Sequence, residues 1–415
     1  MANVERRRAH GGPYRVGVKA DATPTVPAPT TWEVLRTFFK LGLTSFGGPI
    51  AHLGYFRTEF VDRKRWLRDE EYADLVSLCQ FLPGPASSQV GIAVGLRRAG
   101  LPGALAAWCG FTLPSAVALV AFALGLAHRV PSGVLHGLML VAVAVVAQAL
   151  WQMARTACRG PVEVLVAAAA LTVSLLWPAA WVQITVVAAG LLLGWAVFAR
   201  STPAVVVGAA DRTVSRRSGV IALLLFAALL VLLPVLAGLS GSLAVDVANT
   251  FYRVGSMVFG GGHVVLPLLD TEVVGSGWVT TDDFLAGYGA AQAVPGPLFT
   301  FSAYLGASMS QPLLMAPVAL LAIFLPSFFL VVGVMPFWDE LRANAAMRAA
   351  LRGVNAAVVG ILAAAFYRPV ITSAVGEPLD VLVVLLAFAA LVWLRTPPWV
   401  VVLGAALAGV LLATF

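Results

Sequence analysis

Two short segments combine residue types from which proteins build oxyanion sites. They share a Gln-x-x-Pro-Gly-Pro sequence followed by hydroxyl side chains: Gln80 to Pro85 with Ser87 and Ser88, and Gln292 to Pro297 with Thr300 and Ser302. Proline breaks a helix but suits the first turn of a new one, so a helix is predicted to begin at each break. Helix N-termini bind oxyanions through free N–H groups and a partial positive charge. Gly84 and Gly296 let the backbone approach an ion, and the glutamine amides can donate hydrogen bonds. The alternative is that the glycines and prolines only permit tight packing.

Two cations lie in apolar sequence ahead of these breaks. Lys40 belongs to FKLGLTSFGG, which ends at Gly47 and Gly48, and Arg253 belongs to the matching YRVGSMVFGG, which ends at Gly260 and Gly261. Ionisable residues at membrane depth are costly and are usually functional. The two cations would suit a dianion, and the glycine turns join the predicted substrate-binding set. The alternative is that both cations lie at helix ends and extend to the membrane surface.

Few other side chains offer chemistry. Asp74 has Ala286 at its matching position and is a candidate proton carrier, with a surface or helix-start role as the alternative. Glu59 and Glu272 also match, flank loops and are expected to be solvated.

Signatures of enzymes and metal sites are missing from the sequence. There is no GxxxxGK[ST], HExxH or GxSxG, so an ATP-driven pump, a zinc protease and an α/β-hydrolase are not expected. Cys79, Cys109 and Cys158 are scattered in apolar sequence, which favours buried small side chains over a metal or disulfide site. His52 and His263 flank the glycine turns out of register and receive no role. Neither a cofactor nor an enzymatic activity is predicted.

The matched segments belong to a duplication of the chain. The offset is 212 or 213 positions, the difference between Gly296 and Gly84 or between Arg253 and Lys40. It also pairs Trp66 with Trp278, and one Leu-Pro-Ser, at 113–115, with another at 325–327. Duplicated halves with broken helices in an apolar chain are typical of transporters.

The composition places the chain in a lipid bilayer. Of its 415 residues 60% are hydrophobic and 11% charged, and the mean hydropathy is +0.90. Apolar stretches of roughly 20 residues can cross about 30 Å of hydrocarbon. They lie near 103–127, 134–154, 161–178, 180–199, 219–238, 313–337, 345–366, 379–394 and 398–414. Much of the net charge of +7 sits in the tail and in short loops, so a nucleic-acid partner is not expected.

Equivalent loops carry opposite charge. The loop from Arg57 to Arg68 holds five Lys or Arg residues, whereas the loop from Asp270 to Asp283 holds none and four acidic residues. Basic short loops stay in the cytoplasm, so the halves are predicted to be inverted, with the unpaired span at 219–238 turning the second half over. The N-terminus is then cytoplasmic and the C-terminus outside. The predicted parts are a disordered basic tail (1–30), a first repeat (31–199), a connector with the extra span (200–242) and a second repeat (243–415).

The Pro-Gly-Pro breaks indicate that some helices do not cross the membrane as single rods. Basic residues on both sides of 69–96 favour a re-entrant hairpin of two half-helices that meet at the Pro-Gly-Pro, although a broken full span is also compatible. The fold class is therefore an all-α polytopic membrane protein built from two inverted-topology repeats with broken or re-entrant helices.

Five segments resemble the signature blocks of the chromate ion transporter family in its long two-domain form. They are LGLTSFGGPIAHLGYFRTEFVDRKRW (41–66), QFLPGPASSQVG (80–91), RAGLPGALAAW (98–108), VFGGGHVVLPLL (258–269) and AAQAVPGPLFTFSAYLG (290–306). The likeness covers roughly residues 31–415. It implies export of chromate across the bacterial inner membrane, and thereby chromate resistance, with sulfate as the close analogue.

The residues alone indicate only a secondary transporter for an oxyanion. An inside-negative potential of 100 mV gives each outgoing negative charge about 2.3 kcal/mol, so export of a dianion needs no ATP. A carrier for sulfate or another oxyanion is the second hypothesis, and a membrane-embedded enzyme is a distant third. The oligomeric state cannot be read from the sequence.

The opposite loop charges predict opposite membrane faces. Arg63→Cys and Ser276→Cys should react with an impermeant thiol reagent from opposite sides of the membrane, as measured in sealed vesicles of both orientations. Labelling of both positions from one side would contradict the inverted repeat.

Overall fold

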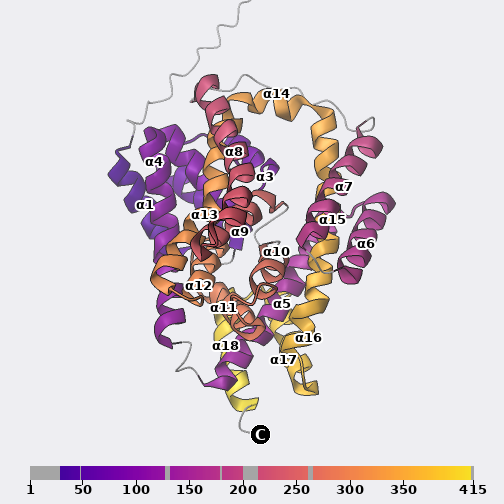
Figure 1. Cartoon of the computed structure of the whole chain (residues 1–415). Coiled ribbons are helices and arrows are strands. Elements are labelled where there is room, and N and C mark those ends of the chain that lie inside the picture. Colours follow the sequence, from indigo (N-terminus) through magenta and orange to yellow (C-terminus); the bar gives the residue numbers. More distant parts are fainter. Residues whose placement is uncertain are drawn as a thin grey trace, which may run out of the picture.

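The computed structural model describes residues 29–46, 48–126, 131–177, 180–199, 214–259 and 265–412. All regular structure in these ranges is helical (Figure 1). Six helices are long and apolar enough to cross a membrane: Ala86–Gly125, Ser132–Ala157, Trp181–Phe198, Arg216–Ser240, Pro312–Leu341 and Ala345–Ala374. Three of the predicted spans form the shorter apolar helices Pro161–Leu176, Pro378–Val392 and Pro398–Leu412. The predicted N-terminal tail lies outside the described residues.

The two halves have matching element orders. The first half contains α1 (Thr31–Thr44), α2 (Gly48–Arg57), η1 (Thr58–Arg63), α3 (Asp69–Phe81), α4 (Ala86–Ala121), η2 (Phe122–Leu126), α5 (Ser132–Ala157), α6 (Pro161–Leu176) and α7 (Ala180–Phe198). The unpaired span is α8 (Arg216–Ser240). The second half begins with α9 (Leu243–Met257), α10 (Val265–Leu269), η4 (Asp270–Val274), α11 (Thr281–Ala293), η5 (Leu298–Thr300), α12 (Phe301–Ala307) and α13 (Pro312–Val334). It continues with η6 (Met335–Phe337), α14 (Trp338–Ala343), α15 (Ala345–Ala365), η7 (Phe366–Ile371), α16 (Thr372–Ala374), α17 (Pro378–Val392) and α18 (Pro398–Leu412).

Helix α4 is a hairpin rather than one rod. The backbone leaves the helical conformation at Ala99 and Gly100, where φ is −142° and 64°. Beyond this kink the two arms pack through glycine, because a Cβ on Gly95 would lie 2.3 Å from the Gly103 carbonyl oxygen. The first arm (86–98) therefore returns along the second arm (101–121).

The first arm of α4 and helix α3 form a re-entrant pair. The Arg97 guanidinium, at the end of that arm, lies 2.8 Å from the Glu71 carboxylate in the first turn of α3. The beginning of α3 and the end of the arm therefore lie together, with the Pro-Gly-Pro break at the far tip. This is the hairpin geometry that the flanking basic residues predict.

The two hairpins approach from opposite ends of the molecule. The indole of Trp338 in α14 donates a hydrogen bond to Asp74 in α3 at 3.0 Å, whereas α11 packs against α16. Helices α14 and α16 flank α15 at its two ends (Figure 1). The structure thus has the inverted arrangement expected from the sequence.

The halves are also interleaved. Helices α6 and α7 of the first half pack against α15 of the second, and α17 and α18 pack against α5 of the first (Figure 1). Within each half, glycine permits one close crossing: a Cβ on Gly42 of α1 would lie 2.6 Å from the Gly110 carbonyl oxygen in α4, and one on Gly255 of α9 would lie 2.2 Å from the Ile323 carbonyl oxygen in α13. Each half therefore depends on the other for its packing.

The α1–α4 crossing gives a test of stability. Gly42→Leu should lower the melting temperature, because overpacking costs roughly 1–3 kcal/mol and the nearest atoms are rigid backbone. Gly54→Ala is the control: no atom lies within 4 Å of its Cβ position, and alanine favours a helix by about 1 kcal/mol. Thermal unfolding in detergent, followed by tryptophan fluorescence, measures both. A Gly42→Leu protein as stable as the wild type would contradict the crossing.

Candidate functional site

Each Pro-Gly-Pro break is held by the opposite half of the chain. The Gly84 N–H donates to the Val258 carbonyl at 2.7 Å, and the Gly296 N–H donates to the Ser45 carbonyl at 2.9 Å. Val258 and Ser45 occupy the same repeat position, directly after α9 and α1. Both glycines have positive φ, 123° and 107°, a region that side chains disfavour. The breaks and the helix ends that support them thus form two crossed junctions.

A serine from the opposite half lies against each break. A Cβ on Gly84 would lie 2.8 Å from Ser327 Oγ in α13, and one on Gly296 would lie 2.7 Å from Ser115 Oγ in α4. These serines end the two Leu-Pro-Ser segments, which the sequence analysis uses only as markers of the duplication. Their repetition at matched positions is the signal that could have identified them as site residues.

A histidine joins three elements at the first break. His52 of α2 is buried, with Nδ1 3.3 Å from Ser87 Oγ and Nε2 3.1 Å from the Ser45 carbonyl oxygen. Because a carbonyl only accepts, Nε2 carries the proton and Nδ1 accepts from the Ser87 hydroxyl. His52, which has no role in the sequence analysis, therefore ties the end of α1 and the start of α2 to the first turn of α4.

Two buried hydroxyls at the first break, Ser88 Oγ and Ser327 Oγ, have no hydrogen-bond partner among the described residues. The Gln89 side chain donates its Nε2 hydrogen to the Pro83 carbonyl, which leaves its acceptor Oε1 unpartnered. Ser45 Oγ and Thr112 Oγ1 are also unpartnered within the described part of the chain, on residues whose carbonyls accept from Gly296 and Ser115 at the second break. An unpaired buried polar group costs about 1–3 kcal/mol, and most native ones are paired. The first N–H groups of α4 also have no partner within the helix. Hydroxyl and backbone N–H donors therefore lie where the N-terminus of α4 meets Ser327, an arrangement that offers hydrogen bonds to an ion that accepts them.

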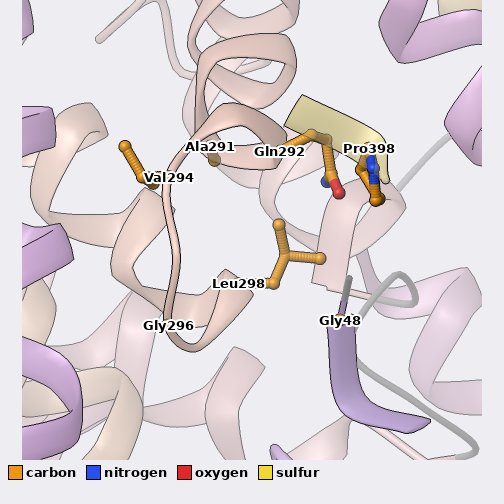
Figure 2. Close-up of a pocket in the computed structure, with 7 residues that line it drawn as sticks. All are labelled: Gly48, Ala291, Gln292, Val294, Gly296, Leu298 and Pro398. Atoms are coloured by element: carbon orange, nitrogen blue, oxygen red, sulfur yellow. The ribbon is translucent and has the colours of Figure 1, made fainter. Parts of the chain in front are cut away.

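The second break lines a narrow cavity (Figure 2). Its lining residues are Gly48, Ala291, Gln292, Val294, Gly296, Leu298 and Pro398. The Gln292 amide is directed toward Leu298 and Pro398 (Figure 2), and its buried Nε2 has no partner among the described residues. The volume of about 20 Å³ holds little more than a water molecule. Gly48, Gln292 and Gly296, all predicted from the sequence, thus meet in one constricted space.

The other predicted hydroxyls of the second break are paired locally. Thr300 Oγ1 donates to the Pro297 carbonyl and Ser302 Oγ to the Phe299 carbonyl, each at 2.7 Å. Gln80 differs from its counterpart Gln292, because its side chain is exposed. The remaining predicted glycines, Gly47, Gly260 and Gly261, lie outside the described residues, as does His263.

The matched charges do not gather at the breaks. Lys40 is exposed on α1, and Arg253 forms an ion pair with Glu272. The expectation that Glu59 is solvated differs from the structure: Glu59 is buried, with its carboxylate 3.4 Å from the Arg63 guanidinium. Its loop folds back on α1 and removes it from solvent, and this fold is not visible in the local sequence. Asp74, the candidate proton carrier, is half-buried and accepts the Trp338 hydrogen bond.

The duplication coincides with two matches to one protein family. The family model described as chromate transporter matches residues 32–195 and 245–410, one match for each half. This chain belongs to the chromate transporter family.

Relatives of this chain are similar over most of its length. The chromate transport protein of Pseudomonas aeruginosa is 28% identical over 369 residues, covering 85% of this chain and 84% of the relative. That of Cupriavidus metallidurans is 27% identical over 406 residues, covering 94% and 95%. An uncharacterised transporter of Methanocaldococcus jannaschii is 25% identical over 348 residues, covering 82% and 84%. No solved structure matches this chain. The chain is a multi-pass membrane protein of a transporter family.

The unpartnered hydroxyl of Ser327 gives a test of the site. Ser327→Ala should raise the melting temperature of the unliganded protein, because it removes a buried polar group without a partner. It should weaken chromate or sulfate binding by roughly 1.5–3 kcal/mol, the contribution of a hydrogen bond to a charged group, or on the order of tenfold to a hundredfold.

Ser115→Ala is the matched control, since the Ser115 hydroxyl already donates to the Thr112 carbonyl at 3.1 Å. It should not stabilise the unliganded protein. Thermal shifts of the purified proteins, with and without the anion, measure both effects. Reduced stability of Ser327→Ala together with unchanged affinity would contradict the site.

Proposed function

We propose that this protein exports chromate from the bacterial cytoplasm and thereby gives resistance to chromate. The observation that carries the proposal is the first crossed junction, where the N-terminus of α4 and the unpartnered hydroxyls of Ser88 and Ser327 gather in the interior of a chromate transporter family member. Chromate is a tetrahedral dianion that only accepts hydrogen bonds, so this donor set complements it.

The donors at the site favour a transport site, which must release its ion, over a site that holds its ion tightly. The donors at the junction are hydroxyls and backbone amides, and the matched cations Lys40 and Arg253 lie elsewhere. A transport site must attract its ion and also release it, so binding has to be moderate. Dipolar donors without a charged partner in contact satisfy both needs. Sulfate has the same shape and charge as chromate, and it is the second candidate substrate for this reason.

The direction follows from the membrane potential. An inside-negative potential of 100 mV provides about 2.3 kcal/mol for each negative charge moved outward, and a dianion gains twice as much. In this proposal the face that carries Arg57, Arg68 and Arg97 is cytoplasmic, which places the N-terminus inside and the C-terminus outside the inner membrane. The repeats at 31–199 and 243–415 then form the transport unit, and the segment 200–242 connects them.

Flux through the breaks tests the function. Gly84→Leu and Gly296→Leu should each abolish chromate accumulation in inverted vesicles, because a side chain at either glycine would enter the junction, within 3 Å of Ser327 or Ser115. Gly277→Leu is the control: Gly277 also has positive φ (70°), but no atom lies within 4 Å of its Cβ position.

The assay measures chromate by colour and sulfate by radiolabel, in vesicles whose protein content is matched by immunoblot. Accumulation of unchanged chromate by the wild type and by Gly277→Leu, and by neither break variant, is the expected result. Wild-type flux through either break variant would show that the ion passes elsewhere. Chemical conversion of the anion without accumulation would indicate an enzyme instead.

A further inference from the structure

The two re-entrant hairpins differ in how deeply they are buried. Helix α11 is buried at every position from Phe284 to Ala291, whereas its counterpart α3 buries only Tyr72, Leu75, Leu78 and Cys79. Helix α11 packs against α5 and α18. The contact is close, since a Cβ on Gly289 would lie 2.2 Å from the Leu138 carbonyl oxygen. Helix α3 has no comparable packing against α15 or α7, the equivalent elements.

The exposed face of α3 is polar. Glu70, Ala73, Ser77 and Gln80 are all exposed, and their spacing places them on one side of the helix. A carboxylate, a hydroxyl and an amide on one exposed helix face are unfavourable against hydrocarbon but suit a water-filled space. Such a face would suit an aqueous space that opens at the end of the molecule where Arg97 and Glu71 close the hairpin.

The matched charges show the same asymmetry. Arg253 and Glu272 form an ion pair between α9 and η4. Lys40 and Glu59 occupy the same repeat positions, yet Lys40 is exposed and Glu59 pairs with Arg63 one turn further along its own segment. The second half, whose hairpin is buried, thus has its Arg253–Glu272 ion pair formed. The first half, whose hairpin is exposed, has no Lys40–Glu59 ion pair.

We propose that this structure is one of two conformations that exchange the roles of the repeats. In the other conformation α3 docks on α15, where Ser77 contacts α15 as Gly289 now contacts α5, and Lys40 pairs with Glu59. At the same time α11 leaves α5, and the Arg253–Glu272 pair opens. Each ion pair, or latch, forms in only one of the two conformations and stabilises it. This inference rests on the proposed transport function, but the conformational exchange does not depend on which anion is carried.

The contact positions of the two hairpins correspond but are not identical. Gly289 lets α11 pack directly against the α5 backbone, whereas the equivalent position on α3 is Ser77, which would face Ala350 in place of Leu138. Because serine has a side chain, α3 would dock on α15 at a larger separation than α11 has from α5. Inverted repeats of similar structure can adopt each other's conformation, which opens the site to each face in turn. Removing one latch removes a favourable interaction from one conformation only, so the population shifts to the other.

Thiol accessibility tests the proposal without any substrate. The full-length protein, with Cys79, Cys109 and Cys158 replaced by alanine, would carry Ser77→Cys as a reporter on α3 or Ala286→Cys as a reporter on α11. An impermeant maleimide should label Ser77→Cys rapidly and Ala286→Cys slowly in sealed vesicles. Adding Glu272→Gln should reverse this order, with a several-fold change in each rate.

Matched variants distinguish an effect of the ion pairs on conformation from a general loss of stability. Arg253→Gln should act like Glu272→Gln, whereas Lys40→Gln should leave Ser77→Cys as reactive as before or more so. A Ser77→Cys, Ala350→Cys pair should form a disulfide under oxidation, at a rate that Glu272→Gln increases.

Two results would overturn the proposal. One is a Ser77→Cys reporter that is unreactive from both faces, which would place the α3 face in lipid or protein. The other is an equal effect of Glu272→Gln and Lys40→Gln on the two reporters. Reactivity that alternates as expected in a protein that carries no chromate would leave the conformational exchange standing and reject the proposed function.

Discussion

Every backbone N–H and carbonyl at membrane depth needs a hydrogen-bond partner, and a helix that breaks inside the membrane must find partners outside itself. In this protein each break finds one in the opposite repeat, through Gly84 to Val258 and Gly296 to Ser45. Neither half can close its own break. The duplication and the glycines at positive φ meet this requirement, and α6, α7, α17 and α18 also pack against the opposite half.

The same constraint supplies hydrogen-bond donors that would suit the proposed anion. A helix that begins inside the protein presents free N–H groups, and the crossing brings the Ser327 hydroxyl of the other repeat against them. At the first junction the Ser88 and Ser327 hydroxyls have no partner among the described residues, whereas at the second the Ser115, Thr300 and Ser302 hydroxyls are paired locally and the Gln292 amide nitrogen lacks a partner. The two junctions thus share the same backbone hydrogen bonds but differ in how their polar side chains are paired. A pseudo-symmetric molecule in an asymmetric conformation is what transport between two faces requires.

Much of this architecture could be predicted from the sequence, because it depends on local chemistry and on repetition. The breaks at 83–85 and 295–297, the extra span α8 and the inverted order of the halves follow from prolines, glycines, apolar length and loop charge. The crossed contacts could not be predicted, since nothing local to Ser327 indicates that Gly84 lies beside it. The burial of Glu59 and the pairing of Arg253 with Glu272 depend on tertiary packing in the same way. Matched residues were predicted to act alike, but Gln80 is exposed whereas Gln292 is partly buried and lines the narrow cavity.

The most direct test of the account is the position of the bound ion. Chromium scatters anomalously near its absorption edge, so crystals of the protein grown with chromate would locate the ion without reference to any mutant. The account predicts an anomalous peak at the first junction, within hydrogen-bonding distance of the first turn of α4 and of Ser327 Oγ. A peak elsewhere would contradict it, for example in the cavity between α5, α6 and α15 that Arg159, Glu163 and Arg352 help to line.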